Sequence, residues 1–197
     1  MLKLDEFKDL REHPKYPQVI SPCLNQSYPV LFAMIDQYLQ IHPNMQLFHI
    51  GHDEVYYFLA NPACEKFRSL TGIQNQYELF AYHLSIITKY IREKRPNLRL
   101  LIWHDVLQNL NIQMLQKYDL LDFVNPVLWS YREDIAVEGF IVGPQSTMFG
   151  QFKSLWGATA FKGATDEVAT ISNVKHYYDS MHIPIKPTKI QFILLFI

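Results

Sequence analysis

Short apolar runs recur along the chain, and longer segments with helical periodicity lie between them. Continuous apolar runs bounded by turn residues are typical of buried parallel strands. Five segments at most fit this description. They are residues 47–50, 98–103, 123–129, 155–161 and 189–197. Pro126 weakens the third prediction, because proline is poorly tolerated inside a central strand.

Helices are predicted in the intervals between these runs. Leu31, Met34, Ile35 and Tyr38 recur at helical spacing between Pro29 and Pro43, which delimit the first helix. Three prolines within residues 13–22 predict a loop there. The remaining helical segments are a short piece from Asn61-Pro62 to Gly72, a long helix over 76–94, a turn at 113–117 and a helix at 166–181.

The alternation of strands and helices predicts an α/β fold with a parallel sheet, and it places a site at the carboxyl ends of the strands. Five strands are too few for a closed eight-stranded barrel, which typically takes about 250 residues. An open doubly wound sheet could use five strands, but the glycine-rich phosphate turn of a dinucleotide-binding protein is absent from the sequence.

Composition narrows the choice of partners. The 197 residues carry a net charge of -1 and are 49% hydrophobic, which suits one globular domain with a substantial core. No basic stripe indicates nucleic acid, and no segment is long enough to span a membrane. Cys23 and Cys64 lack metal-ligand spacing and are too few for a disulfide framework, so a reducing compartment is expected.

The strongest chemical signal is the stretch LFHIGHDEVYY at 47–57, where adjacent acids, Asp53 and Glu54, follow a predicted strand through Gly51. Two neighbouring carboxylates repel each other, which raises the pKa of at least one of them. Such a pair is either functional or a solvated pair that complements a helix dipole at a helix start.

Four motifs, taken in order, resemble one enzyme family. HIGHDEV at 49–55 resembles the His-x-Gly-x-Asp-Glu signature of the family 20 glycoside hydrolases, the β-N-acetylhexosaminidases. LIWHD at 101–105, PVLWSY at 126–131 and LWGATAFKGAT at 155–165 extend the resemblance to the intracellular branch of that family. The resemblance covers nearly all of the chain up to about Met181.

The resemblance implies an incomplete TIM (β/α)8 barrel. Residues 1–197 would form a partial catalytic domain that supplies the tail of strand three, strands four to seven and an altered or truncated eighth strand. The chain would then be a fragment, because the family's first-strand arginine, its third-strand histidine and its strand-eight residues have no counterpart here.

The resemblance also implies substrate-assisted catalysis, in which the sugar's own 2-acetamido oxygen attacks the anomeric carbon. Glu54 would be the general acid and then the base, while Asp53 would hold and polarise the acetamido group. One carboxyl must be protonated while its neighbour stays ionised, and mutual repulsion separates the two pKa values. Tyr131 would donate a hydrogen bond to the acetamido oxygen.

The other implied site residues surround the sugar. They are the pocket-wall residues Trp103, Trp129 and Trp156, the supporting residue His49, and the acids Asp105 and Asp134. No metal and no cofactor is implied. The expected partners are glycans or glycoconjugates ending in N-acetylgalactosamine or N-acetylglucosamine. The implied location is the cytoplasm, with the nucleus as a second compartment. The resemblance is also compatible with a homodimer of the complete protein.

Three positions depart from the family pattern: His52 replaces a small residue, His104 stands where an acid is expected, and Ser130 stands where relatives carry an aspartate. Two alternatives therefore stay open. The first is a metal-dependent barrel hydrolase that uses six candidate ligands. These are His49, His52, Asp53, Glu54, His104 and Asp105. The second is a non-catalytic remnant that binds sugar or a partner.

Overall fold

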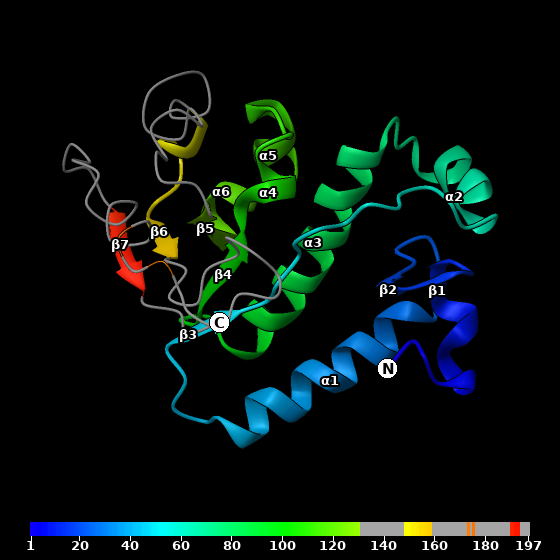
Figure 1. Ribbon diagram of the computed structural model, residues 1–197, viewed down its shortest axis with the longest axis horizontal. Helices are drawn as coiled ribbons and strands as arrows, with labels where there is room; N and C mark the ends of the chain where they lie inside the picture. Colours follow the sequence, from blue (N-terminus) through cyan, green and yellow to red (C-terminus); the bar gives the residue numbers. More distant parts are fainter. Residues whose placement is uncertain (131–147, 159–172, 174, 176–189, 194–197) are drawn as a thin grey trace. The chain divides into compact units, whose positions relative to one another are not determined.

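The computed structural model describes residues 1–130, 148–158, 173, 175 and 190–193. Its central feature is a five-stranded sheet with the strand order β3-β4-β5-β6-β7 (Figure 1). The strands are β3 (Leu47–His49), β4 (Arg99–Trp103), β5 (Val124–Trp129), β6 (Leu155–Ala158) and β7 (Ile190–Ile193). All five lie within the segments predicted as strands. The register is parallel for β4 with β5, β5 with β6, and β6 with β7.

This sheet confirms the α/β prediction and the parallel arrangement. Successive strands are spatial neighbours, which is the order that consecutive βα units produce in a barrel. Strand β5 continues through Pro126, which pairs with Ile102 although proline has no N–H to give to the ladder. Burial of its other residues stabilises the strand, because Val124 and Val127 are fully buried.

The helices at 27–41, 63–71, 76–94 and 112–117 agree with predicted segments, whereas the short helices at 5–10, 104–107 and 120–123 were not predicted. Pro29 lies in the first turn of α1, and α2 ends at Gly72, which adopts the left-handed conformation (φ 74°) that closes helices. The Asn75 side chain caps the start of α3. The helices are the 3₁₀ helix η1 (Asp5–Leu10), α1 (Ser27–Ile41), α2 (Ala63–Thr71), α3 (Gln76–Lys94), α4 (His104–Leu107), α5 (Ile112–Lys117) and α6 (Leu120–Phe123). No helix among the described residues is both long and apolar enough to cross a membrane.

The prediction of a loop over residues 13–22 is wrong. Strands β1 (Arg11–His13) and β2 (Tyr16–Ile20) form an antiparallel hairpin in which His13 pairs with Tyr16. Pro14 lies in the two-residue turn. Pro17 lies in β2, where it is tolerated because a two-stranded sheet consists only of edge strands.

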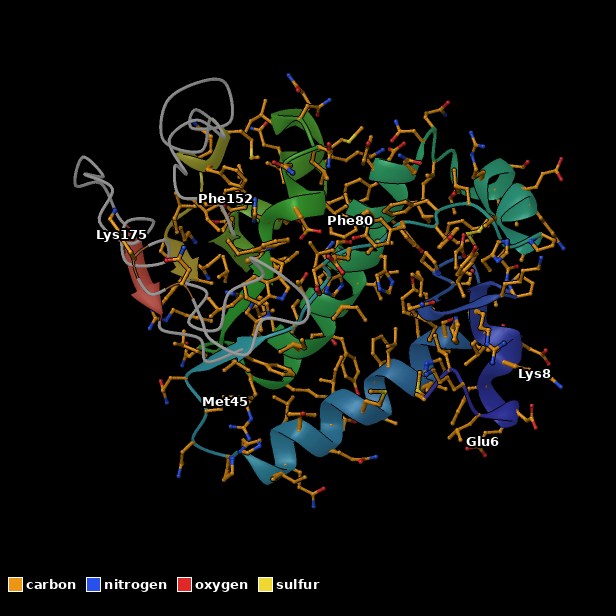
Figure 2. All side chains as sticks on the ribbon, in the orientation of Figure 1. Glu6, Lys8, Met45, Phe80, Phe152 and Lys175 are labelled. Atoms are coloured by element: carbon orange, nitrogen blue, oxygen red, sulfur yellow. A yellow bond between two sulfur atoms is a disulfide. The ribbon has the colours of Figure 1, made fainter. Side chains whose placement is uncertain are left out.

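The chain divides into two compact units. The first comprises Met1–Phe48, Glu54–Arg99 and Gln113–Leu120, and the second comprises His49–Asp53, Leu100–Ile112 and Leu121–Ile197. In the first unit α1 packs against α3 (Figure 1), and the Phe32 and Tyr90 rings stack with centroids 3.7 Å apart. In the second unit β4, β5 and β6 contribute buried apolar residues, and Phe149 and Phe152 are fully buried with them (Phe152 is labelled in Figure 2).

A disulfide joins Cys23 and Cys64 in the first unit, and disulfides are drawn as yellow bonds in Figure 2. The sequence analysis expected a reducing compartment and no disulfide framework, so this pairing differs from the expectation. The two cysteines are 41 residues apart, and spacing gave no sign that folding brings them together. They belong to a small buried cluster with Ile73 and Leu79, against which Phe67 packs.

The predicted helix at residues 166–181 lies outside the described residues, as do the ends of the predicted strands at 155–161 and 189–197.

Candidate active site

The candidate site begins where β3 ends. Beyond β3 the chain stays hydrogen-bonded to β4, because the Ile50 N–H donates to the Leu101 carbonyl (2.9 Å) and the Trp103 N–H donates to the Gly51 carbonyl (3.1 Å). After Gly51 the chain turns away into a segment without regular secondary structure. Asp53 and Glu54 therefore follow soon after the carboxyl end of β3, beyond the Ile50 and Gly51 bonds to β4.

The backbone around the acids adopts a conformation that most residues avoid. Gly51 has a φ of 72°, His52 of 70° and Glu54 of 49°, all in the left-handed region. Glycine adopts this region readily, but a residue with a Cβ does so at a cost of about 1–3 kcal/mol. Such conformations gather at active sites, where the surrounding structure holds them. Both acids are exposed residues.

His49, the last residue of β3, is half-buried and packs on Trp103 with ring centroids 4.4 Å apart. Its Nδ1 accepts a hydrogen bond from the Gly51 N–H (3.1 Å), so the proton of the neutral ring resides on Nε2. Burial lowers the pKa of His49 to about 4, although the charge of Asp53 opposes this shift. His49 is therefore neutral at physiological pH, and it fixes the turn at Gly51.

His52 is also half-buried, and its Nδ1 lies 2.7 Å from the Ile50 carbonyl oxygen. A carbonyl oxygen only accepts, so Nδ1 of His52 carries the proton. Burial lowers the pKa of His52, while the bond to Ile50 and the charge of Asp53 raise it. The ring is thus fixed against its own backbone, and it helps to hold the left-handed turn that carries Asp53.

Polar residues also follow β4. Trp103 ends the strand half-buried, His104 is buried as the first residue of α4, and Asp105 is half-buried in the first turn of that helix. Burial lowers the pKa of His104 to about 4, and a hydrogen bond to the Val127 backbone partly opposes the change. The His104 ring meets the Trp129 ring edge-on, with centroids 5.9 Å apart. His104 is therefore a neutral packing residue between β4 and β5.

The other two tryptophans lie on the next strands. Trp103 pairs in register with Val127, and Val127 pairs with Trp156, so these three residues lie at one level of the parallel sheet. Trp129 lies two residues beyond Val127 at the end of β5 and is half-buried. Trp156 is buried in β6. Ser130, which follows Trp129, is buried as well.

Comparison with known proteins places this geometry in a family. Residues 5–138 match the family described as "Glycosyl hydrolase family 20, catalytic domain". The chain belongs to glycosyl hydrolase family 20. Hexosaminidase D of Homo sapiens is 35% identical over 178 residues, which cover 90% of this chain and 36% of that protein. Hexosaminidase D of Bos taurus is 29% identical over 177 residues, which cover 90% of this chain and 51% of that protein.

Two solved structures are similar in fold. A β-N-acetylhexosaminidase from Bacteroides fragilis matches with a TM-score of 0.53 and 16% identity, over 76% of this chain and 28% of that one. An exo-β-N-acetylglucosaminidase from Vibrio harveyi, solved with N-acetylglucosamine, matches with a TM-score of 0.50 and 22% identity, over 71% of this chain and 19% of that one. The domain is thus of the TIM-barrel type. The chain spans about a third to a half of the length of its two curated relatives.

Within this family 20 domain, the structure describes most of the predicted site residues. His49, Asp53, Trp103, Asp105, Trp129 and Trp156 belong to the second unit, and Glu54 belongs to the first. Tyr131 and Asp134 lie outside the described residues. The roles assigned to all of these residues remain predictions.

The alternative of a metal-dependent hydrolase gains no support from the described part of the chain. There, the group of three potential ligands whose donor atoms lie within 4.8 Å of one another is Glu12, Cys23 and Cys64. None of the six residues of that alternative belongs to this group. Sequence analysis missed Glu12 altogether, and the signal that could have revealed it is a single acid inside a hairpin strand, which is too common to be specific.

Proposed function

We propose that the protein is a β-N-acetylhexosaminidase that removes terminal N-acetylgalactosamine or N-acetylglucosamine from glycoconjugates by a substrate-assisted, retaining mechanism. One observation carries the proposal. In a family 20 domain, the exposed acids Asp53 and Glu54 follow the end of β3, on a backbone in which Gly51, His52 and Glu54 itself adopt the left-handed conformation. The family relatives named hexosaminidase and acetylglucosaminidase support the same class of substrate.

In this proposal Glu54 protonates the glycosidic oxygen as the bond breaks, and the acetamido oxygen of the sugar attacks the anomeric carbon. Asp53 accepts a hydrogen bond from the acetamido N–H and stabilises the positive charge that develops on that group. Glu54 then takes a proton from the water that opens the cyclic intermediate. Two displacements at one carbon retain its configuration, so no nucleophile from the protein is required.

His49 and His52 support the acids in this scheme. Both rings are neutral at physiological pH, because burial lowers their pKa values, so neither competes with the substrate for the charge of Asp53. Trp103 offers an aromatic ring at the adjacent strand end, and the apolar C–H face of a sugar packs well on such a ring.

The experiment compares aryl N-acetyl-β-glucosaminides and galactosaminides with the matching aryl glucosides and galactosides, on the full-length protein. We expect turnover of the acetamido sugars only, because the nucleophile belongs to the substrate. We also expect competitive inhibition by a thiazoline analogue of the cyclic intermediate. Equal rates on both kinds of sugar would indicate an ordinary two-carboxylate mechanism. Tight binding of the thiazoline without turnover of any substrate would indicate a sugar-binding protein.

A further inference from the structure

Three buried ligand groups from separate segments meet in the first unit, away from the acid pair in sequence. Glu12 comes from β1, Cys23 follows β2, and Cys64 lies in the first turn of α2. Their exposed fractions are 1%, 7% and 1%. One donor atom from each lies within 4.8 Å of the donor atoms of the other two.

The environment of Glu12 is unusual for a carboxylate. Its Oε1 accepts a hydrogen bond from the Ala60 N–H (2.8 Å), and its two oxygens lie 3.6 and 3.8 Å from the Cys64 sulfur. Among the described residues, no lysine, arginine or histidine forms an ion pair with it. Burying a carboxylate costs several kcal/mol unless a cation and hydrogen bonds compensate for the lost water.

The disulfide between Cys23 and Cys64 gives this carboxylate no compensation, because a disulfide sulfur has neither a proton to donate nor a positive charge. Reduction of the disulfide would turn both sulfurs into potential metal ligands. Two thiolates and a carboxylate, buried together, form a ligand set that suits a divalent cation of borderline softness. We propose that the reduced protein binds a zinc-type divalent cation through Cys23, Cys64 and Glu12.

The chemistry balances in two steps. An external dithiol delivers two electrons and two protons to the Cys23–Cys64 bond, which yields two thiols and a disulfide of the reductant. The cation then bonds to both sulfurs and to a Glu12 oxygen, and the two thiol protons leave to solvent. A water molecule completes a tetrahedral set. Magnesium and calcium are disfavoured, because both prefer oxygen ligands to thiolates.

The surroundings provide an entry path and a consequence. A cavity of about 480 Å³ is lined by residues that include Ala60, Asn61, Cys64 and Arg68, so this open space reaches one of the three ligand residues. The cation would replace the disulfide as the link between the β1–β2 hairpin and α2. Ala60 donates a hydrogen bond to Glu12 and lies six residues after Glu54. The disulfide or the cation would therefore anchor the segment that follows the acid pair.

The test is a cobalt titration of the full-length protein, reduced with a phosphine, freed of the reductant and kept without oxygen. We expect one Co²⁺ per chain, with the visible bands of a tetrahedral site and a thiolate-to-cobalt charge-transfer band in the near ultraviolet. Zinc should displace the cobalt. The oxidised protein should show no such bands, because it has no thiolate to offer.

Variants identify the ligands. Cys64→Ser should abolish the charge-transfer band or halve it, and Glu12→Gln should weaken cobalt binding by about tenfold to a hundredfold while both thiolates remain. Glu65→Gln is the matched control: this acid is exposed, follows Cys64 and lines the same cavity, so affinity should not change.

A measurement on the wild type alone covers the case in which a variant does not fold. Zinc should protect both cysteines of the reduced protein from alkylation. The proposal is overturned if the reduced wild type binds no stoichiometric cobalt, or if zinc leaves the cysteines fully reactive. It is also overturned if folded Glu12→Gln binds cobalt as the wild type does. None of these readouts depends on glycosidase activity.

Discussion

Two pairs of acidic residues have opposite environments in this fold. Asp53 and Glu54 are exposed, and they stand on a backbone segment without regular secondary structure and with several left-handed residues. Glu12 and Glu78 are buried, and their carboxylates accept hydrogen bonds from backbone N–H groups, of Ala60 for Glu12 and of Gln74 for Glu78. The first pair is therefore placed by its local backbone conformation. The second pair is held by hydrogen bonds inside the fold, for Glu12 from a residue 48 positions away and for Glu78 from a residue four positions before it.

Glu78 shows what a purely structural acid looks like. It lies in the first turn of α3 and forms an ion pair with Lys117, and the Tyr118 hydroxyl donates to the same oxygen (3.3 Å). The Gln74 N–H and the Lys117 ammonium hold the pKa of Glu78 below its usual value. A carboxylate with this many fixed donors is locked in its ionised form, which suits structure and not proton transfer.

The largest expected effect is the loss of activity when Glu54, an exposed acid, is replaced. Glu54→Gln should lower kcat of the full-length protein for aryl N-acetylhexosaminides about 100-fold to 10,000-fold, the usual contribution of general acid catalysis. Its free energy of unfolding should change by less than about 0.5 kcal/mol, because the side chain is exposed. Steady-state kinetics and denaturant titration measure the two quantities. Glu65→Gln, also exposed, is the control, and near wild-type activity of Glu54→Gln would remove this residue from its role.

The next effect concerns protons and the buried histidine of the sheet. The pKa of His104 is about 4 in the folded protein, compared with its ordinary value of 6.5. Between these two pH values the imidazole is protonated in the unfolded chain but neutral in the folded protein. Stability should therefore fall by about 3 kcal/mol as pH drops from about 6.5 to about 4, and this contribution should level off below that range.

The test measures unfolding by denaturant at several pH values. His104→Gln should remove this part of the pH dependence, and the exposed His42→Gln should keep it. An unchanged pH profile in His104→Gln would show that this imidazole is not the group responsible. His49, which has the same lowered pKa, should add a separate contribution in the same range.

Much of the fold could be predicted because its signals are local. The runs at β3 and β4 are mostly apolar, and β5 is apolar apart from Asn125 and Pro126. Helix α3 was predicted with its bounds because a clear helical period ends just before Pro96. The hairpin β1–β2 was missed because its prolines predict a loop. Strands of three and five residues are too short to show a clear alternation of apolar and polar residues against that signal. A two-stranded ribbon accepts proline at positions that a central strand would not.

The candidate site divides in the same way. Asp53 and Glu54 stand out because they are neighbours after a strand, and that signal needs no long-range information. Ala60, which donates to Glu12, and Lys117, which pairs with Glu78, lie 48 and 39 residues away from these acids, and the two cysteines lie 41 residues apart. Such pairings depend on tertiary structure, so no spacing rule could have found them. The neutral state of His49 and His104 likewise follows from burial, which the sequence does not reveal.

A smaller effect tests whether Glu78 is structural. Glu78→Ala should destabilise the protein by about 2 kcal/mol, because it leaves the Gln74 N–H and the Lys117 ammonium without their acceptor. Glu78→Gln should cost less, since the amide oxygen still accepts. Denaturant unfolding at neutral pH measures both variants, and Glu93→Ala on the exposed side of α3 is the control. A loss of kcat in folded Glu78→Gln without a loss of stability would contradict the structural assignment.

The smallest effect lies at the start of α3, three residues before Glu78. The Asn75 side chain accepts hydrogen bonds from the Tyr77 and Glu78 N–H groups, each 3.0 Å long, so it satisfies two of the donors that a helix start leaves open. Asn75→Ala should therefore cost about 1 kcal/mol, whereas Asn75→Ser should keep most of the stability because a serine oxygen can cap as well. The two variants differ only in the capping atom, so their difference isolates the cap from any change in backbone propensity. If alanine and serine proved equally stable, the cap would contribute nothing, and the position of Glu78 would depend on Lys117, Tyr118 and Gln74.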